Sequence, residues 1–126
     1  KGVLYRRGAE ERQTKKSRKP VRMTRRLLSH CKRWHDSGAR WLVEIGGQRV
    51  GDIKHAFEGA RARANLPDVT PHVLKHTAIT WAIQKGLTVE DAADYFDTSA
   101  ETIRRVYYHH SPHYMDRALE ILERKL

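Results

Sequence analysis

The chain has 126 residues, of which 39% are apolar, and a formal net charge of +10. This length supports one core and is too short for two, so we expect one domain, or most of one, over residues 1–126. No apolar run approaches the roughly 18 residues of a membrane helix, and no secretory signal pattern is present, which favours a cytoplasmic protein without a membrane partner.

The positive charge is concentrated at the start of the chain. Residues 1–26 hold 11 Lys and Arg against 2 acidic residues, whereas residues 27–126 hold 14 against 13. Clustered cations gain affinity for phosphates by releasing condensed counterions, so this segment predicts a polyanionic partner. Taken alone, it is explained equally well as a solvated charge run.

The first elements predict an antiparallel hairpin. Residues 2–7 and 19–23 are short β-prone runs, and the charged stretch between them has its tip at residues 13–17. Because the chain begins inside the first of these runs, we expect it to be a piece of a longer protein.

A helix follows, capped by Thr24 and ending at Ser37-Gly38 after about residue 35. Cys31 is the single cysteine, so it forms no internal disulfide, and we expect a core thiol in a reducing compartment. The apolar face expected to carry it also contains Leu27, Leu28 and Trp34.

The middle of the chain predicts a short strand and a second helix. Residues 41–45 indicate the strand, residues 46–47 its turn, and residues 52–65 an amphipathic helix. The face of this helix that we expect to point inward contains Ile53, Ala56, Phe57, Ala60 and Ala64.

From residue 70 onward the pattern is helical. Thr70-Pro71 predicts an N-cap followed by proline at the first helical position, and Gly86 closes that helix. The side chains that we expect to face the core from this helix are Leu74, Thr77, Ala78 and Trp81.

Three further helix starts are indicated by capping residues. Thr88 with Asp91, and Thr98 with Glu101, resemble capping boxes, and Ser111-Pro112 repeats the cap-then-proline pattern before a last helix. The last helix carries an apolar stripe of Met115, Ala118, Leu119, Leu122 and Leu126. The predicted fold class is therefore α+β and mainly α, with a small antiparallel sheet or hairpin at the N-terminal side followed by a helical bundle.

Polar chemistry gathers on the helix that begins at Thr70. His72, Lys75 and His76 lie at positions i, i+3 and i+4, which places them on one face. Two histidines at this spacing can bind zinc, but the glutamate of a zinc-protease helix is replaced by Val73 and no third ligand is evident, so we expect no metal. A buried or capping histidine is the structural alternative.

Two segments resemble the tyrosine recombinases, the phage integrase family. Residues 69–86 look like the box in which a histidine and, three residues later, an arginine hold the scissile phosphate. Residues 92–112 are similar to the nucleophile segment of proteobacterial phage integrases, with Tyr107 nine residues beyond Thr98. The hairpin at Thr14-Lys15 resembles the mobile β-hairpin that carries the general-acid lysine of the family.

The resemblance implies site-specific DNA recombination or integration through a 3′-phosphotyrosine intermediate, without a cofactor. Tyr107 would attack the phosphate, Lys15 would protonate the leaving 5′-oxygen, His72 would hydrogen-bond the phosphate and Lys75 would supply positive charge. The expected partners are double-stranded DNA and, on DNA, a homotetramer joined through the C-terminal helix. The residues expected to bind DNA are Lys16, Arg18, Lys19, His76, Arg104 and Arg105.

Three departures from the family pattern bear on activity. Lys75 stands where the family has arginine and lacks the planar two-pronged donor set, although the charge remains. Thr98 stands where histidine or tryptophan is usual, and its expected capping role explains it structurally. The first catalytic arginine of the family has no counterpart, so we expect this piece alone to be catalytically incomplete.

Two other functions stay open. Residues 87–108 also resemble a helix-turn-helix, in which Arg104 and Arg105 enter a major groove and Tyr107 is only a core residue. Against it, Asp97 occupies the turn position where such motifs commonly place glycine. The other alternative is a degenerate recombinase domain that binds DNA without cutting it.

Overall fold

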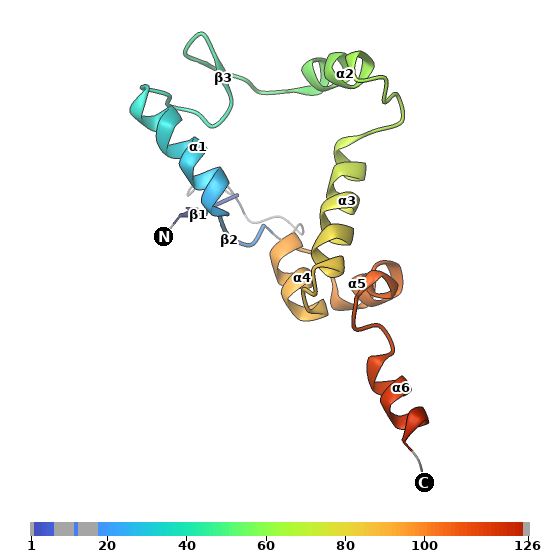
Figure 1. The fold of residues 1–126 in the computed structure, drawn as a ribbon. Helices are drawn as coiled ribbons and strands as arrows, with labels where there is room; N and C mark the ends of the chain where they lie inside the picture. The colour runs from blue at the N-terminus through green and yellow to red at the C-terminus, as the bar shows by residue number, and fades with distance from the viewer. Residues whose placement is uncertain (1, 7–11, 13–17, 125–126) are drawn as a thin grey trace. The chain divides into compact units, whose positions relative to one another are not determined.

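A computed structural model describes residues 2–6, 12 and 18–124 of the chain (Figure 1). The protein is mainly helical with a small antiparallel sheet near its N-terminus, which confirms the predicted fold class. The described residues form two compact units. The first unit contains residues 2–6, 12 and 20–69, and the second unit contains residues 18–19 and 70–124.

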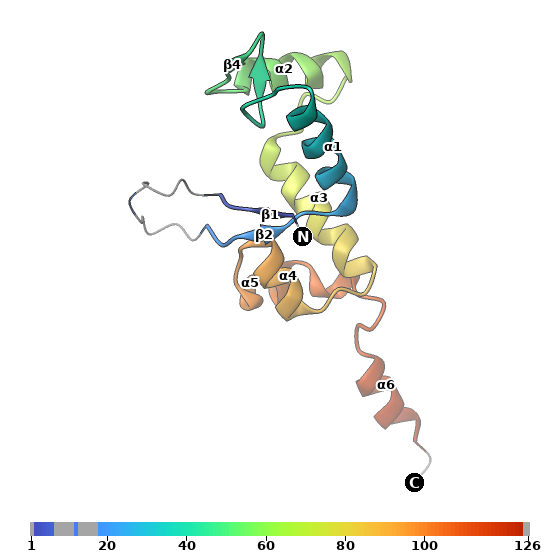
Figure 2. The same cartoon turned by 90° about the vertical axis from the view of Figure 1, so that its left-hand side faces the viewer.

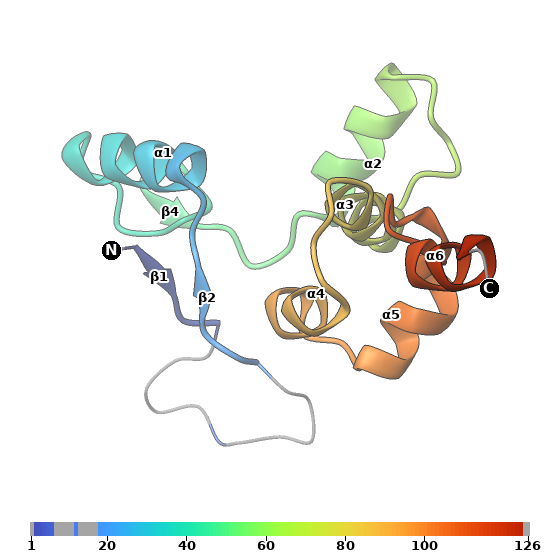
Figure 3. The same ribbon diagram turned by 60° about the horizontal axis from the view of Figure 1, so that its bottom comes forward.

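The first unit begins with the predicted hairpin strands. Strand β1 (Val3–Leu4) pairs antiparallel with β2 (Val21–Arg22), and the two strands lie side by side in Figure 3. Helix α1 (Arg25–Asp36) follows, and the Thr24 hydroxyl accepts a hydrogen bond from the backbone N–H of Leu27 at 3.3 Å. The strands and the cap are confirmed, while the predicted tip at residues 13–17 lies outside the described residues.

A second small hairpin connects α1 to the next helix. Strand β3 (Glu44–Ile45) pairs with β4 (Gln48–Arg49) across a turn whose residues Gly46 and Gly47 have φ of 57° and 74°. Positive φ is accessible to glycine without steric cost, so this pair specifies the turn. Helix α2 (Lys54–Arg63) lies within the predicted range.

The apolar faces predicted for α1 and α2 are not buried in the first unit. Neither helix has a buried residue among those described, Leu27 and Trp34 are 41% and 42% exposed, and Cys31 is half-buried. Ile53 at the start of α2 is 50% exposed. The prediction of an inward-facing core on these helices is therefore wrong for this unit, because the described residues around them do not cover them closely enough to bury a side chain.

The second unit holds the buried core. Its helices are α3 (Pro71–Gln84), α4 (Val89–Phe96), α5 (Ala100–Val106), the 3₁₀ helix η1 (Tyr108–His110) and α6 (Asp116–Glu123). Figures 1 and 2 show α4 and α5 gathered beside α3. The buried side chains are Ile79, Ile83, Val89, Ala92, Ala93, Ile103 and Tyr107. None of the described helices is long and apolar enough to cross a membrane.

The helix starts in this unit follow side-chain caps. The hydroxyls of Thr70 and Thr88 accept hydrogen bonds from the backbone N–H of Val73 and Asp91, which confirms both predicted N-caps. The cap of α5 is Ser99, which accepts from the Thr102 N–H at 3.1 Å.

The prediction that Thr98 caps α5 is therefore wrong. Asp97, at the end of α4, adopts a left-handed conformation with φ of 53°, and the N–H of Thr98 bonds the carbonyl of Ala93. That bond closes α4 in the manner of a C-terminal cap and moves the start of α5 by one residue.

The face of α3 that points into the core also differs from the prediction. Ile79 and Ile83 are buried, with exposed fractions of 1% and 0%, whereas Leu74 and Trp81 are 51% and 61% exposed. Apolar residues occur around the whole circumference of this helix, so the position of its packing partners α4 and η1 decides which face is buried.

The last helix is shorter than predicted. Helix α6 begins at Asp116, after Met115 in a left-handed conformation with φ of 64°, and not at Ser111-Pro112. Within the described part of α6 no side chain is buried, and Leu119 and Leu122 are 51% and 79% exposed. The described residues of its apolar stripe are therefore left uncovered by the second unit, and Leu126 lies outside the described residues.

Candidate active site

Tyr107 lies where α5 ends and η1 begins. Its backbone N–H bonds the carbonyl of Ile103 at 2.9 Å, and it closes α5 as the C-cap residue. The side chain is only 4% exposed and belongs to the core cluster with Ile79, Ile83 and Ile103. The predicted nucleophile is thus a core residue of the second unit, held in place by packing.

The hydroxyl of Tyr107 reaches α3. It forms a hydrogen bond with Nδ1 of His76, and the two ring centroids are 5.7 Å apart. The ring of His72, one helical turn earlier, meets His76 edge to face at 4.4 Å. The structure therefore brings three of the predicted site residues together from segments about 30 positions apart.

Sequence reasoning assigned His76 to DNA binding only and missed its contact with Tyr107. A signal was present, because His76 lies three residues before Ile79 and seven before Ile83, on the helix face that is buried. The apolar side chains of Leu74 and Trp81 mask this signal, because they indicate a different core face for the helix.

The polar end of α3 is open to solvent. His72, Lys75 and His76 are all exposed, whereas the ring of Tyr107 beneath them is buried. Burial raises the pKa of the Tyr107 hydroxyl above its ordinary value, so the group is protonated at neutral pH.

The basic residues predicted to contact DNA have different surroundings. Lys15 and Lys16 lie outside the described residues, and Arg18 is exposed. The ammonium of Lys19 binds the carboxylate of Asp94 on α4 at 2.8 Å. This hydrogen bond, with the charges of Asp94 and Asp97, raises the pKa of Lys19.

Arg104 and Arg105 lie in the last turn of α5, and both are exposed. Arg104 forms an ion pair with Glu90 of α4 at 2.5 Å. Both side chains of this pair are more than half exposed, so it contributes little to stability but places a carboxylate beside the guanidinium.

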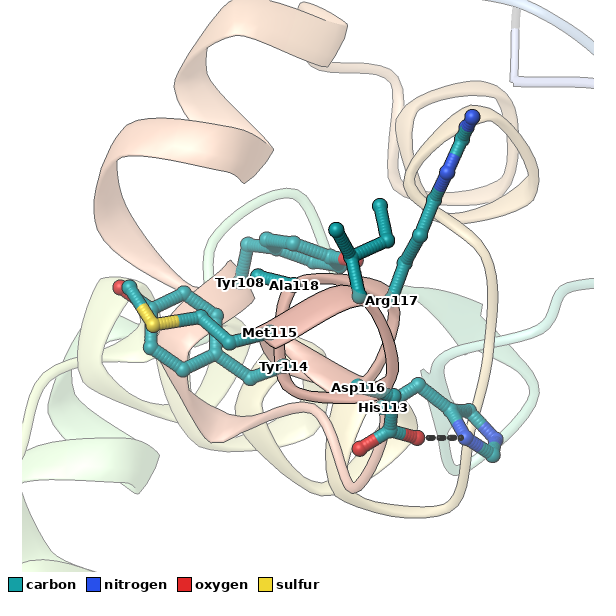
Figure 4. Close-up of a pocket in the computed structure, with 8 residues that line it drawn as sticks. Tyr108, His113, Tyr114, Met115, Asp116, Arg117 and Ala118 are labelled. Carbon is teal, nitrogen blue, oxygen red and sulfur yellow. Dashed lines mark hydrogen bonds and ion pairs between the residues drawn. The ribbon is translucent and has the colours of Figure 1, made fainter. Parts of the chain in front are cut away.

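A pocket of about 430 Å³ lies between η1 and α6 (Figure 4). The rings of Tyr108 and Tyr114 meet edge to face at 5.8 Å, and His113 Nδ1 lies 3.1 Å from the carboxylate of Asp116. The predicted catalytic residues that the structure describes, Tyr107, His72 and Lys75, do not line this pocket. Among the described residues no group of His, Cys, Asp and Glu has the arrangement of a metal site.

Comparison with known proteins found no family model, no curated protein and no solved structure that matches this chain.

Proposed function

We propose that this chain belongs to a DNA strand-cutting and rejoining enzyme of the tyrosine recombinase kind, with Tyr107 as its nucleophile. The observation that carries the proposal is the hydrogen bond between the Tyr107 hydroxyl and His76, beside His72. A tyrosine that served only as packing would need a partner for its hydroxyl, but not one on the exposed cationic end of α3.

The chemistry follows from these groups. The Tyr107 oxygen attacks a backbone phosphate, the bond from phosphorus to the 5′-oxygen breaks, and a phosphotyrosine link retains the energy needed for resealing. His72 would hydrogen-bond the phosphate, and Lys75 would place positive charge where negative charge develops. Lys15, assigned as proton donor to the 5′-oxygen, lies outside the described residues.

The proposed partner is double-stranded DNA, in keeping with the charge of residues 1–26. We further propose that α6 joins copies of the protein on DNA as a tetramer, because Leu119, Ile121 and Leu122 are each more than half exposed and need an apolar surface to cover them. Cutting in the cytoplasm of a bacterial host, on chromosomal or phage DNA, would be consistent with this assignment.

The decisive experiment traps the covalent intermediate. The protein, expressed from its complete reading frame, is incubated with a library of nicked duplexes of random sequence. After cleavage, the short strand released with the 5′-hydroxyl diffuses away, so resealing cannot occur and the adduct persists. We expect a protein–DNA adduct that survives denaturation, that is lost in Tyr107→Phe and that is retained in Tyr108→Phe. An adduct that follows Tyr108 instead would move the site by one residue. The absence of any adduct from the unmutated protein, despite DNA binding, would support the non-cleaving recombinase-like domain.

A helix-turn-helix module is the second candidate, and one observation favours it. Asp97 in the turn between α4 and α5 has φ of 53°, the left-handed conformation that glycine usually supplies in this motif. Asp97 therefore no longer counts against the motif. In its disfavour, the Arg104 guanidinium is paired with the carboxylate of Glu90 and would have to leave it to contact a base.

The two candidates differ in what Arg104 and Arg105 do. For a helix-turn-helix, replacing either by alanine relaxes sequence preference, each contact to a base being worth roughly 1–3 kcal/mol, and no adduct forms. For the recombinase, the same changes weaken binding and leave Tyr107 able to form the adduct.

A further inference from the structure

We propose that His76 is the base that takes the proton from Tyr107 during attack, an inference that rests on the proposed function. The sequence pattern assigns this histidine only to DNA contact. The recombinase-like box of residues 69–86 assigns the chemistry to His72 and Lys75. The geometry points instead to His76, because its Nδ1 is hydrogen-bonded to the oxygen that would attack.

The position of His76 suits a proton acceptor. Its helix face is fixed by Ile79 and Ile83, which are buried one and two turns further along α3. The ring of His72 packs against it edge to face, with planes at 88°, which restricts its rotation. The imidazole is exposed, so after Nδ1 accepts a proton from Tyr107 the ring can release its Nε2 proton to solvent.

The buried hydroxyl needs such an acceptor. An ordinary tyrosine is ionised to about one part in a thousand at neutral pH, and desolvation of the Tyr107 ring reduces that fraction further. Spontaneous ionisation therefore supplies little nucleophile. A base in contact with the hydroxyl removes the proton as the bond to phosphorus forms, which typically accelerates a step by roughly 10²–10⁴-fold.

The step balances in atoms and charge. The proton of Tyr107 moves to Nδ1 of His76 as the tyrosine oxygen bonds to phosphorus, and the bond from phosphorus to the 5′-oxygen breaks. The 5′-oxygen takes a proton from the general acid or from water and leaves as a hydroxyl group. The imidazolium of His76 then returns its proton to solvent.

The proposed role of His76 requires one tautomer of the free protein, which can be observed without DNA. Neutral His76 must carry its proton on Nε2 so that Nδ1 accepts from the Tyr107 hydroxyl. Long-range proton–nitrogen correlation spectra at about pH 8, where an ordinary imidazole is neutral, distinguish the tautomers. The His76 signals are assigned by their loss in His76→Asn. We expect protonated Nε2, and an Nδ1 shift that changes in Tyr107→Phe. A proton on Nδ1, or no response to Tyr107→Phe, would overturn the inference.

Adduct formation then tests the role in the reaction. Asparagine places an oxygen or nitrogen near the Nδ1 position and keeps the hydrogen bond, but it cannot take up a proton. We expect His76→Asn to form the adduct roughly 10²–10⁴-fold more slowly at saturating DNA, a concentration at which a change in DNA affinity does not alter the rate. In His76→Gly, added imidazole should restore the rate in proportion to its concentration. His55→Asn, the same change at a 98% exposed side chain of α2, serves as the control and should leave the rate unchanged.

The outcomes separate the two proposals. A wild-type adduct with an unimpaired His76→Asn would refute the role of His76 and leave Tyr107 as the nucleophile. A wild-type protein that forms no adduct would refute the proposed function itself, and the role of His76 with it. The ring tautomer would then report a structural hydrogen bond.

Discussion

Replacement of Tyr107 separates its contribution to packing from its contribution to chemistry. Tyr107→Phe keeps the buried ring and removes only the hydroxyl, so the free energy of unfolding should fall by the value of one hydrogen bond, about 0.5–1.5 kcal/mol. Tyr107→Ala removes a ring that is 4% exposed and packs among three isoleucines, and it should cost about 3–5 kcal/mol.

Urea denaturation followed by circular dichroism measures both changes, and Tyr108→Phe is the matched control. Tyr108 is half-buried and its ring packs against Tyr114, so loss of its hydroxyl should change the free energy of unfolding by less than about 0.5 kcal/mol. A Tyr107→Ala variant no less stable than Tyr107→Phe would refute the packing role, because the ring would then contribute nothing to the core. A Tyr107→Phe variant that still formed the covalent adduct would refute the chemical role.

Four further outcomes follow from the same structure. Ser99→Ala should destabilise the protein by about 1 kcal/mol in the same urea assay, and Thr98→Ala by clearly less; equal losses would mean that the N-cap of α5 is misassigned. Because the pKa of Tyr107 is raised in the folded state, its contribution to stability should be complete below about pH 10 and should decline as pH rises through the raised value. Tyr107→Phe should show a shallower alkaline decline, and parallel curves would contradict this. Neutralising Lys15, Lys16, Arg18 and Lys19 together should flatten the salt dependence of DNA binding, by about 0.9 in log–log slope for each phosphate that the protein no longer neutralises. An unchanged slope would mean that these four residues do not contact DNA. A chain cut after Ser111 should melt at nearly the same temperature as the parent, because the described part of α6 has no buried residue, but should no longer assemble on DNA; a lower melting temperature would show that α6 docks on its own chain.

Local signals predicted the starts of helices well where only one residue was a good candidate for the N-cap position. Thr24, Thr70 and Thr88 each precede a helix and each accepts the expected backbone hydrogen bond. At α5, Thr98 and Ser99 are both good N-caps, and the choice was made by the left-handed turn that ends α4. Sequence does not show that turn directly, because glycine usually supplies the left-handed residue at the end of a helix and here the residue is Asp97.

The inward faces of the helices were harder to predict. In α3, Ile79 and Ile83 lie on one side and Leu74 and Trp81 on another, so the apolar pattern alone selects neither. Only the positions of α4 and η1 decide between them, and these depend on contacts far apart in sequence.

The candidate site was predicted in part. The spacing of His72 and Lys75 on one helical turn needed only local pattern, whereas the choice of Tyr107 as nucleophile rests on the resemblance and stays a prediction. The contact between Tyr107 and His76 could not be found in this way, because the two residues are 31 positions apart in sequence. Their contact also depends on α5 ending at residue 106.

The burial of Tyr107 has an evolutionary consequence. On the proposed function, a lineage that no longer cut DNA would still be selected to keep an aromatic ring at this position, since losing the ring would destabilise the second unit by about 3–5 kcal/mol. His76 is less protected, because it is exposed and fills no part of the core, and its replacement would cost stability only through the hydrogen bond to Tyr107. Among descendants of this protein, therefore, retention of an aromatic ring would say little about whether the proposed strand cutting persists, whereas replacement of the tyrosine by phenylalanine, together with drift at the histidine, would mark the copies in which it has been lost.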